Sequence, residues 1–164
     1  MKKITYLIIS IIFLNFINAC AGYKPIYIKN LQFKIADYSI KANKKLGRQI
    51  YSKLYNLSKS NKNNTEIQSI TIIIAATKNK NATVKDSAGK VLEYRIILTS
   101  NIIIKDYLTD DAILNQTFSY SSSYKVQDQY SETIKLEKKS IENLINKTYQ
   151  NLLTKMSEII LTKW

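Results

Sequence analysis

The clearest pattern in the chain is VLEYRIILTSNIIIK, residues 91–105, in which apolar and polar side chains alternate over most of the length. Successive side chains of a β-strand point to opposite faces of the sheet, so the alternation separates an apolar face from a polar one. The apolar face holds Leu92, Tyr94, Ile96, Leu98, Ile102 and Ile104, and the polar face holds Glu93, Arg95, Thr99, Asn101 and Lys105. The pattern predicts an antiparallel sheet with one face packed and the other in water.

Two further strands flank this segment and complete a meander. Residues 67–77 are dense in Ile, and their strand continues through Thr83 and Val84 to a Gly-containing turn at 86–89. A second turn at 109–111 leads into a third strand. That strand carries Leu114, Phe118, Tyr120 and Tyr124 on one face and Asn115, Thr117, Ser119 and Ser121 on the other. Because the three strands are consecutive, we expect them to pair antiparallel.

A short strand and two helices surround the meander. Residues 31–35 alternate as a strand does, and Asp37 or Ser39 is expected to cap the helix that follows. A polar loop at 58–65 separates that helix from the meander, and a long helix begins after residue 127. Both helices have an apolar stripe at spacings of three and four residues. The stripes are Leu46, Ile50, Leu54 and Leu57 in the first helix, and Ile141, Leu144, Ile145, Thr148, Leu152, Met156, Ile159 and Ile160 in the second.

The order of elements is therefore β-α-β-β-β-α. It predicts a fold of the α/β (α+β) class, a two-layer sandwich in which a mostly antiparallel four-stranded sheet carries two helices on one face. A length of 164 residues, of which 45% are hydrophobic, suits one domain with a real core.

The composition excludes several kinds of functional site. The chain has no His and one Cys, so it cannot form a Cys/His zinc site, a Ser–His–Asp triad or an intramolecular disulfide. Its acidic residues are dispersed, without the spacing of an active site. We therefore expect neither an enzyme nor a metal protein.

The charge of +13, from 25 Lys+Arg against 12 Asp+Glu, has two interpretations. One is coding bias, because Ile, Lys and Asn are abundant together, as AT-rich genes tend to produce. The other is an anionic partner, either nucleic acid or a phosphorylated lipid. Only Arg48 and Arg95 are arginines. This disfavours nucleic acid, because bidentate recognition of bases and phosphates favours Arg.

The first twenty residues resemble the export signal of a bacterial lipoprotein. A basic start is followed by an apolar run at 4–19, which is short for a membrane span, and the only Cys comes directly after it. The segment Ile17-Asn18-Ala19-Cys20 resembles the lipobox, from which Asn18 departs. The alternative is an uncleaved anchor with an incidental Cys.

This resemblance implies three segments in the chain. We expect a signal peptide at 1–19, a lipidated tether at 20–30 and a single domain at 31–164. The thiol of Cys20 would carry diacylglycerol and its freed amine an N-acyl chain, with no other cofactor. Two or more acyl chains anchor a protein stably to a membrane.

Almost the whole chain resembles the LPS-assembly lipoprotein LptE in its alphaproteobacterial form. CAGYKPIY, residues 20–27, is similar to the CGF-x-P-L-Y start of that family, with Ala21 as an insertion. KVLEYRIIL, residues 90–98, is similar to the A-x-Y-x-L strand that follows a Gly turn. SYSSSYKVQDQYSE, residues 119–132, is similar to the strand end that leads into the last helix. The order of elements matches as well.

The resemblance implies a lipid-anchored protein of the outer membrane, facing the periplasm and the lumen of a large LptD-like β-barrel. There it would act as a plug and contact lipopolysaccharide. Basic residues near the loop between the second and third strands of the family correspond to Lys85, Lys90 and Arg95, with Lys135 as a further candidate. For each of them the alternative is an ordinary solvated side chain.

Three tyrosines are candidates for the barrel contact, because Tyr combines area with a hydroxyl group. They are Tyr120, Tyr124 and Tyr130, of which Tyr120 and Tyr124 suit core packing equally. Other functions remain open: a different envelope lipoprotein serving as an auxiliary subunit of a transport system, or a lipid-linked hydrolase using carboxylates. Nucleic-acid binding conflicts with export.

Overall fold

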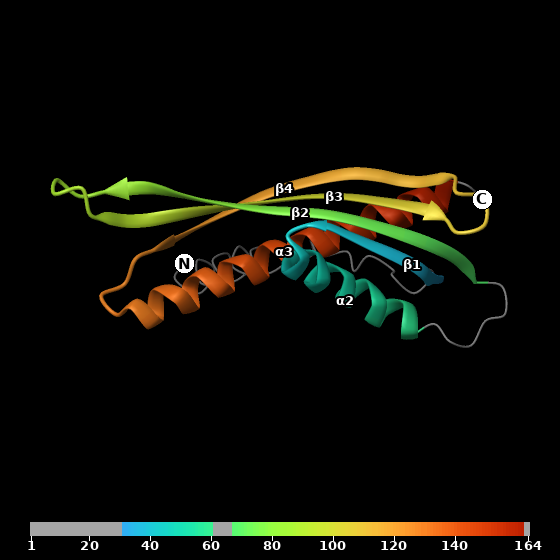
Figure 1. Ribbon diagram of the computed structural model, residues 1–164, viewed down its shortest axis with the longest axis horizontal. Helices are drawn as coiled ribbons and strands as arrows, with labels where there is room; N and C mark the ends of the chain where they lie inside the picture. The colour runs from blue at the N-terminus through green and yellow to red at the C-terminus, as the bar shows by residue number, and fades with distance from the viewer. Residues whose placement is uncertain (1–30, 61–66, 163–164) are drawn as a thin grey trace, which may run out of the picture.

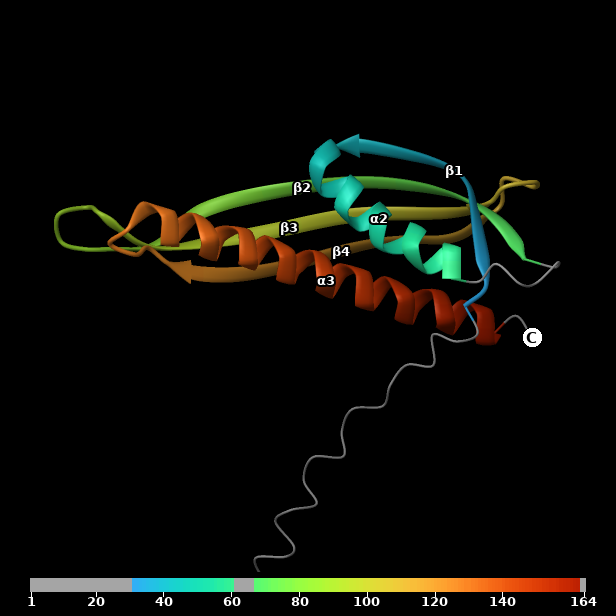
Figure 2. The ribbon, with the colours of Figure 1, turned by 90° about the horizontal axis from the view of Figure 1, so that it is seen from below.

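The computed structural model describes residues 31–60 and 67–162 and has the predicted order of elements (Figure 1). The elements are β1 (Phe33–Ala42), α2 (Lys44–Ser60), β2 (Gln68–Lys85), β3 (Val91–Asp106), β4 (Ala112–Lys125) and α3 (Tyr130–Thr162). Both helices lie on one face of the sheet, which makes a two-layer sandwich (Figures 1 and 2). No helix within the described residues is both long and apolar enough to cross a membrane.

The four strands form one sheet in the order β1-β2-β3-β4. The chain connects β2, β3 and β4 by hairpins, so these strands are antiparallel. By contrast, β1 pairs with β2 in parallel, because α2 lies between them in the chain as a crossover. The sheet is therefore mixed but mostly antiparallel, as the sequence predicted.

The prediction for the first strand and the cap of the first helix was wrong. The strand does not end at Ile35 but continues to Ala42, after a register shift between Ile35 and Asp37. Asp37 and Ser39 thus lie inside β1, and the cap of α2 is Asn43, whose Oδ1 accepts a hydrogen bond from Leu46 N at 3.1 Å. Most side chains beyond the shift are exposed, so β1 has no apolar alternation there; its backbone pairing with β2 defines the strand.

The core lies between the sheet and the two helices, on the face that alternation predicted. The helix-facing side chains of the central strands are fully or almost fully buried: Ile70, Ile72, Ile74, Ala76, Ile96, Leu98, Ile102 and Ile104. From the helices they meet Leu46, Ile50, Leu54, Leu144, Ile145, Leu152, Leu153 and Met156. Leu92 shares the apolar face of β3 but is 41% exposed, because it lies where β2 and β3 extend beyond the helices.

The β2–β3 hairpin, residues 77–95, projects from this body (Figure 1). β1 pairs with β2 only as far as Ala76, so the rest of β2 is an edge strand that pairs with β3 alone. Residues 79–90 are all exposed, although the side chain of Lys80 is partly covered. The hairpin is therefore the part of the sheet that is most accessible to a partner.

Candidate functional site

The tip of the β2–β3 hairpin is a hydrogen-bonded turn with a lysine on each side. Asp86 N donates to Lys90 O at 2.9 Å, and Asp86 Oδ1 accepts from Ala88 N at 3.0 Å and from Lys90 N at 2.9 Å. Gly89 has φ +82°, a conformation that favours glycine. The turn therefore fixes the backbone beside Lys85 and Lys90, whose side chains are exposed.

The structure brings some of the other predicted basic residues to this hairpin and leaves one elsewhere. Arg95 lies on the helix-free face of β3, opposite Asn81 and Ser123, and its Nε donates to Ser123 Oγ at 3.4 Å. It thus belongs to the same hairpin as Lys85 and Lys90. Lys135 belongs to α3 and forms an ion pair with Glu132 at 2.7 Å within that helix.

The three candidate tyrosines have different environments. Tyr124 is 6% exposed and belongs to the core, the second of the two interpretations made for it. Tyr120 is half-buried against the core, and Lys147 Nζ lies 4.7 Å from the centroid of its ring. Tyr130, at the first residue of α3, is 79% exposed. Of the three, Tyr130 has the ring most accessible to a partner.

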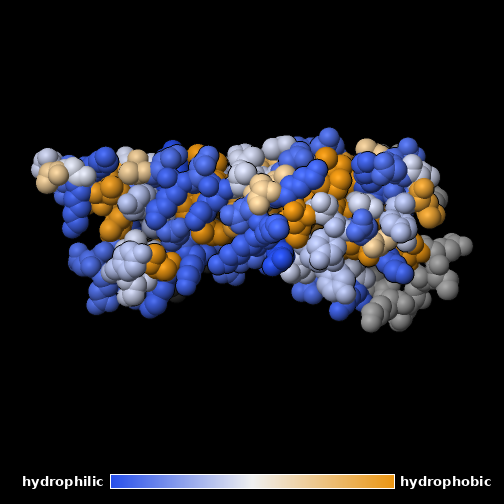
Figure 3. Space-filling model, in the orientation of Figure 1, coloured by the Kyte–Doolittle hydropathy of each residue, from blue (hydrophilic) through white to orange (hydrophobic). Residues whose placement is uncertain are grey.

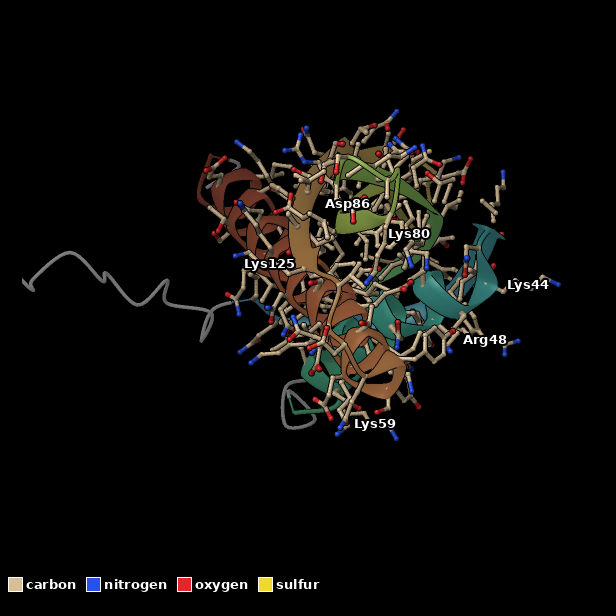
Figure 4. The ribbon with its side chains drawn as sticks, turned by 90° about the vertical axis from the view of Figure 1, so that its left-hand side faces the viewer. Lys44, Arg48, Lys59, Lys80, Asp86 and Lys125 are labelled. Atoms are coloured by element: carbon tan, nitrogen blue, oxygen red, sulfur yellow. The ribbon has the colours of Figure 1, made fainter. Side chains whose placement is uncertain are left out.

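A polar cluster that the sequence analysis missed joins the hairpin to α3. Lys80 Nζ lies 2.7 Å from Glu137 Oε2 and over the ring of Tyr94, 4.2 Å from its centroid. Lys78 Nζ lies 3.1 Å from Glu137 Oε1, and the hydroxyl of Tyr124 donates to Glu137 at 3.0 Å. Figure 4 shows Lys80 between the hairpin and the helices, whereas Lys44, Arg48 and Lys59 point away from the molecule.

The electrostatics of this cluster favour its charged form. Partial burial opposes ionisation of Glu137, but hydrogen bonds from Lys80, Lys78 and Tyr124 lower its pKa to about 2. Burial likewise opposes the charge of Lys80, and the hydrogen bonds to Glu137 and Tyr124 outweigh it, so the pKa of Lys80 is raised. At neutral pH the cluster is therefore a stable ion pair that ties the base of the hairpin to α3.

The helix-free face of the sheet is polar and its side chains bond to one another. Thr99 and Ser119 share a hydrogen bond at 3.2 Å, and Asn101 Nδ2 donates to Thr117 Oγ1 at 3.0 Å and to Asn115 Oδ1 at 3.3 Å. Hydrophilic side chains also dominate the side of the molecule seen in Figure 3, with apolar ones in patches between them. Such a surface suits contact with another hydrogen-bonding surface.

The fold is shared with several solved lipoprotein structures. Rare lipoprotein B from Shewanella oneidensis matches 77% of this chain and 97% of its own, with 14% identity and a TM-score of 0.53. The minor lipoprotein from Acinetobacter baumannii matches 77% of this chain and 92% of its own, with 16% identity and a TM-score of 0.55. Lipoprotein B from Nitrosomonas europaea matches 80% of this chain and 87% of its own, with 16% identity and a TM-score of 0.54.

The chain has the rare lipoprotein B fold. Rare lipoprotein B is of the LptE family, so the fold that the sequence resemblance implied is confirmed. At the level of sequence, no protein-family model and no curated protein matches the chain.

A signal for the missed cluster was present in the sequence of this rare lipoprotein B-like chain. Lys78 and Lys80 continue the buried side of β2 at the strand period, after Ile74 and Ala76. Glu137 lies four residues before Ile141, on the apolar stripe of α3. Charges of opposite sign that extend the buried faces of two elements indicate an ion pair between them.

No group of three or more residues able to hold a metal ion occurs in the described part of the chain.

Proposed function

We propose that the protein is a lipid-anchored lipoprotein of the outer membrane that joins a large LptD-like β-barrel and helps it assemble lipopolysaccharide. The observation that carries the proposal is the projecting hairpin with Lys85 and Lys90 at its tip, on a fold shared with rare lipoprotein B. Lipid A bears phosphate groups, which ammonium groups attract. Among the described residues, the hairpin projects from the body of the domain and can reach such a lipid.

In this proposal the lipid contacts come mainly from one element. Lys85 and Lys90 lie on either side of the fixed turn, and Arg95 extends the basic surface along the helix-free face of the hairpin. Lys135 has a weaker case, because Glu132 neutralises it at 2.7 Å. An anionic headgroup would therefore meet the tip first and Arg95 next.

The barrel contact would use the polar sheet face and Tyr130. A domain inside a barrel lumen needs hydrogen-bonding side chains on its outer surface, and Thr99, Asn101 and Ser119 supply them. Tyr130 adds an exposed aromatic ring with a hydroxyl group. Tyr120 and Tyr124 pack against the core under the helices, so they would not contact the barrel directly.

The anchor rests on the lipobox-like sequence alone, because residues 1–30 lie outside the described part of the chain. The signal peptide at 1–19, the acylation of Cys20 and the tether at 20–30 therefore stay proposals. Mass spectrometry of the mature N-terminus tests them directly. We expect a chain that begins at Cys20 with diacylglyceryl and N-acyl groups, and a Cys20→Ser variant that accumulates as an unprocessed precursor; an intact leader in the wild-type protein would contradict the anchor.

The partner is tested by affinity purification after mild membrane extraction, followed by mass spectrometry. We expect a large outer-membrane β-barrel in stoichiometric amount. Recovery of the subunits of another transport system without such a barrel would favour the alternative, an auxiliary envelope lipoprotein.

The lipid contact is tested by charge reversal at the tip. We expect the Lys85→Glu/Lys90→Glu variant to bind purified lipopolysaccharide at least ten-fold more weakly than the wild-type protein, with a smaller dependence of affinity on salt. The matched control is Lys44→Glu/Arg48→Glu, which makes the same change in charge at exposed residues of α2. An equal loss in both variants would mean that lipopolysaccharide responds only to the net charge, and the tip would have no special role.

A further inference from the structure

A groove of about 560 Å³ opens between the two helices, away from the hairpin tip and the helix-free face. α2 and α3 diverge toward the N-terminal end of α2 (Figure 2), and the groove lies between their facing sides. Its floor is apolar and comes from Leu46 of α2 and from Ile141 and Ile145 of α3. Its volume is in the range of small-molecule sites, roughly 300–1,000 Å³.

Four lysines from three elements surround this floor. Lys45 and Lys53 come from α2, Lys78 from β2 and Lys138 from α3, whereas Glu142 is the one acidic residue among the groove's lining residues. Within the described residues, neither Lys45 nor Lys138 takes part in an ion pair. The mouth of the groove therefore has an excess of positive charge that its own side chains do not neutralise.

The N-terminus of α2 adds to this positive charge. Asn43 and the first-turn residues Lys45 and Leu46 line the groove, and the first turn of α2 contains no acidic residue. The helix dipole at an N-terminus favours an anion, and here only the neutral Asn43 caps it. The groove lysines and the N-terminus of α2 thus both attract an anionic ligand.

We infer that this groove binds a single-chain amphiphile with a phosphate headgroup. The phosphate lies between Lys45 and Lys138, two groove lysines without an ion pair among the described residues, whereas Lys78 is already paired with Glu137. The hydrocarbon chain lies along the floor over Ile141. A phosphate monoester suits the lysines better than a carboxylate, because it has a charge of about −1.5 to −2 at neutral pH and three strong acceptor oxygens. The proposal does not depend on the function proposed above, since it uses no residue of the hairpin tip.

The test is photo-crosslinking of the full-length protein, mixed with phosphatidylcholine vesicles, with a dodecyl phosphate that carries a diazirine on its chain. Trypsin cleaves after Lys139 and after Lys147, so Ile141 and Ile145 fall in one peptide, residues 140–147. We expect the label to concentrate in that peptide. Excess unlabelled dodecyl phosphate should abolish labelling, whereas the same concentrations of inorganic phosphate or uncharged dodecyl maltoside should leave most of it.

Adjacent lysine pairs provide a matched control. We expect Lys45→Gln/Lys138→Gln to lower the labelling at least five-fold. Lys44→Gln/Lys139→Gln removes the same charge from the neighbouring positions, which do not line the groove, and should change the labelling less than two-fold. Ile141→Ser should also lower it, because it removes apolar floor without changing the charge.

Three results would overturn the inference. An equal loss of labelling in the two double variants would mean general attraction to a basic surface. Competition by dodecyl maltoside as strong as by dodecyl phosphate would mean an apolar patch without recognition of the headgroup. A co-purified protein that blocks labelling would assign the groove to a protein partner instead.

Discussion

The two ends of the β2–β3 pair are held in place by different forces. At the end under the helices, Ile72, Ile74 and Ile102 are fully buried against α2 and α3. At the hairpin end, residues 79–90 are all exposed, and one polar cluster at Lys80 and Glu137 joins the hairpin to α3. Burial thus stabilises one end, while backbone pairing and an ion pair hold the other. Regions with few buried apolar contacts open more easily, and binding segments are often of this kind.

The largest expected difference between the two ends comes from removing apolar side chains. Ile74→Ala deletes a fully buried side chain and should lower the free energy of unfolding by about 2–5 kcal/mol. Val84→Ala, at a residue 45% exposed in the hairpin, should change it by less than about 0.5 kcal/mol. Chemical denaturation of both variants measures the effects, and similar losses would mean that the hairpin also packs against a core.

The polar cluster should have the next largest effect. Glu137→Gln leaves Lys78 and Lys80 without their carboxylate partner and should destabilise the protein by about 1–3 kcal/mol. Hydrogen exchange should quicken mostly at the backbone amides of residues 77–85, because the ion pair ties that segment to α3. Faster exchange spread evenly over the sheet would contradict a local role. Glu132→Gln, at an exposed ion pair in the same helix, is the matched control.

The same carboxylate predicts how stability depends on pH. Its pKa in the folded protein is about 2, below the ordinary value of 4.5, so it stabilises the fold above pH 4.5 and ceases to do so as the pH falls toward 2. The wild-type protein should therefore exceed Glu137→Gln in stability by the same amount of about 1–3 kcal/mol near neutral pH and by almost nothing at about pH 2. Comparison of the two proteins cancels the other carboxyl groups. A constant difference across this range would assign the effect to packing rather than to charge.

The same contrast explains which parts of the fold were predictable from the sequence. Alternation in residues 91–105 and the three-and-four spacing after residue 127 arise directly from burial, so the meander and α3 followed from pattern. β1 beyond Ile35 did not, because parallel pairing with β2 involves backbone groups that leave no mark on exposed side chains. The cap of α2 at Asn43 was missed for the same reason, since the helix starts only where the longer strand ends.

The candidate site was predictable where residues are neighbours in the chain. Lys85 and Lys90 flank a Gly-containing turn, so their proximity followed from the hairpin itself. The pairing of Lys80 with Glu137 spans 57 residues and joins a strand to a helix. The strand and helix periods place each charge on a buried face, but the packing of the two elements decides which charges meet. The groove between α2 and α3 has the same origin: four lysines from three elements meet there, and each alone resembles a solvated side chain.

The smallest expected effect lies in the core, where one polar atom is unsatisfied. Ser100 Oγ is buried and has no hydrogen-bond partner in the described part of the chain. Ser100→Ala removes that cost and should stabilise the protein by about 1 kcal/mol. Thr148 is also fully buried, but its hydroxyl donates to Leu144 O at 3.0 Å, so Thr148→Val should not stabilise. If the unfolding midpoints of both variants rise equally, the gain comes from added apolar character and not from removal of an unsatisfied hydroxyl group at Ser100.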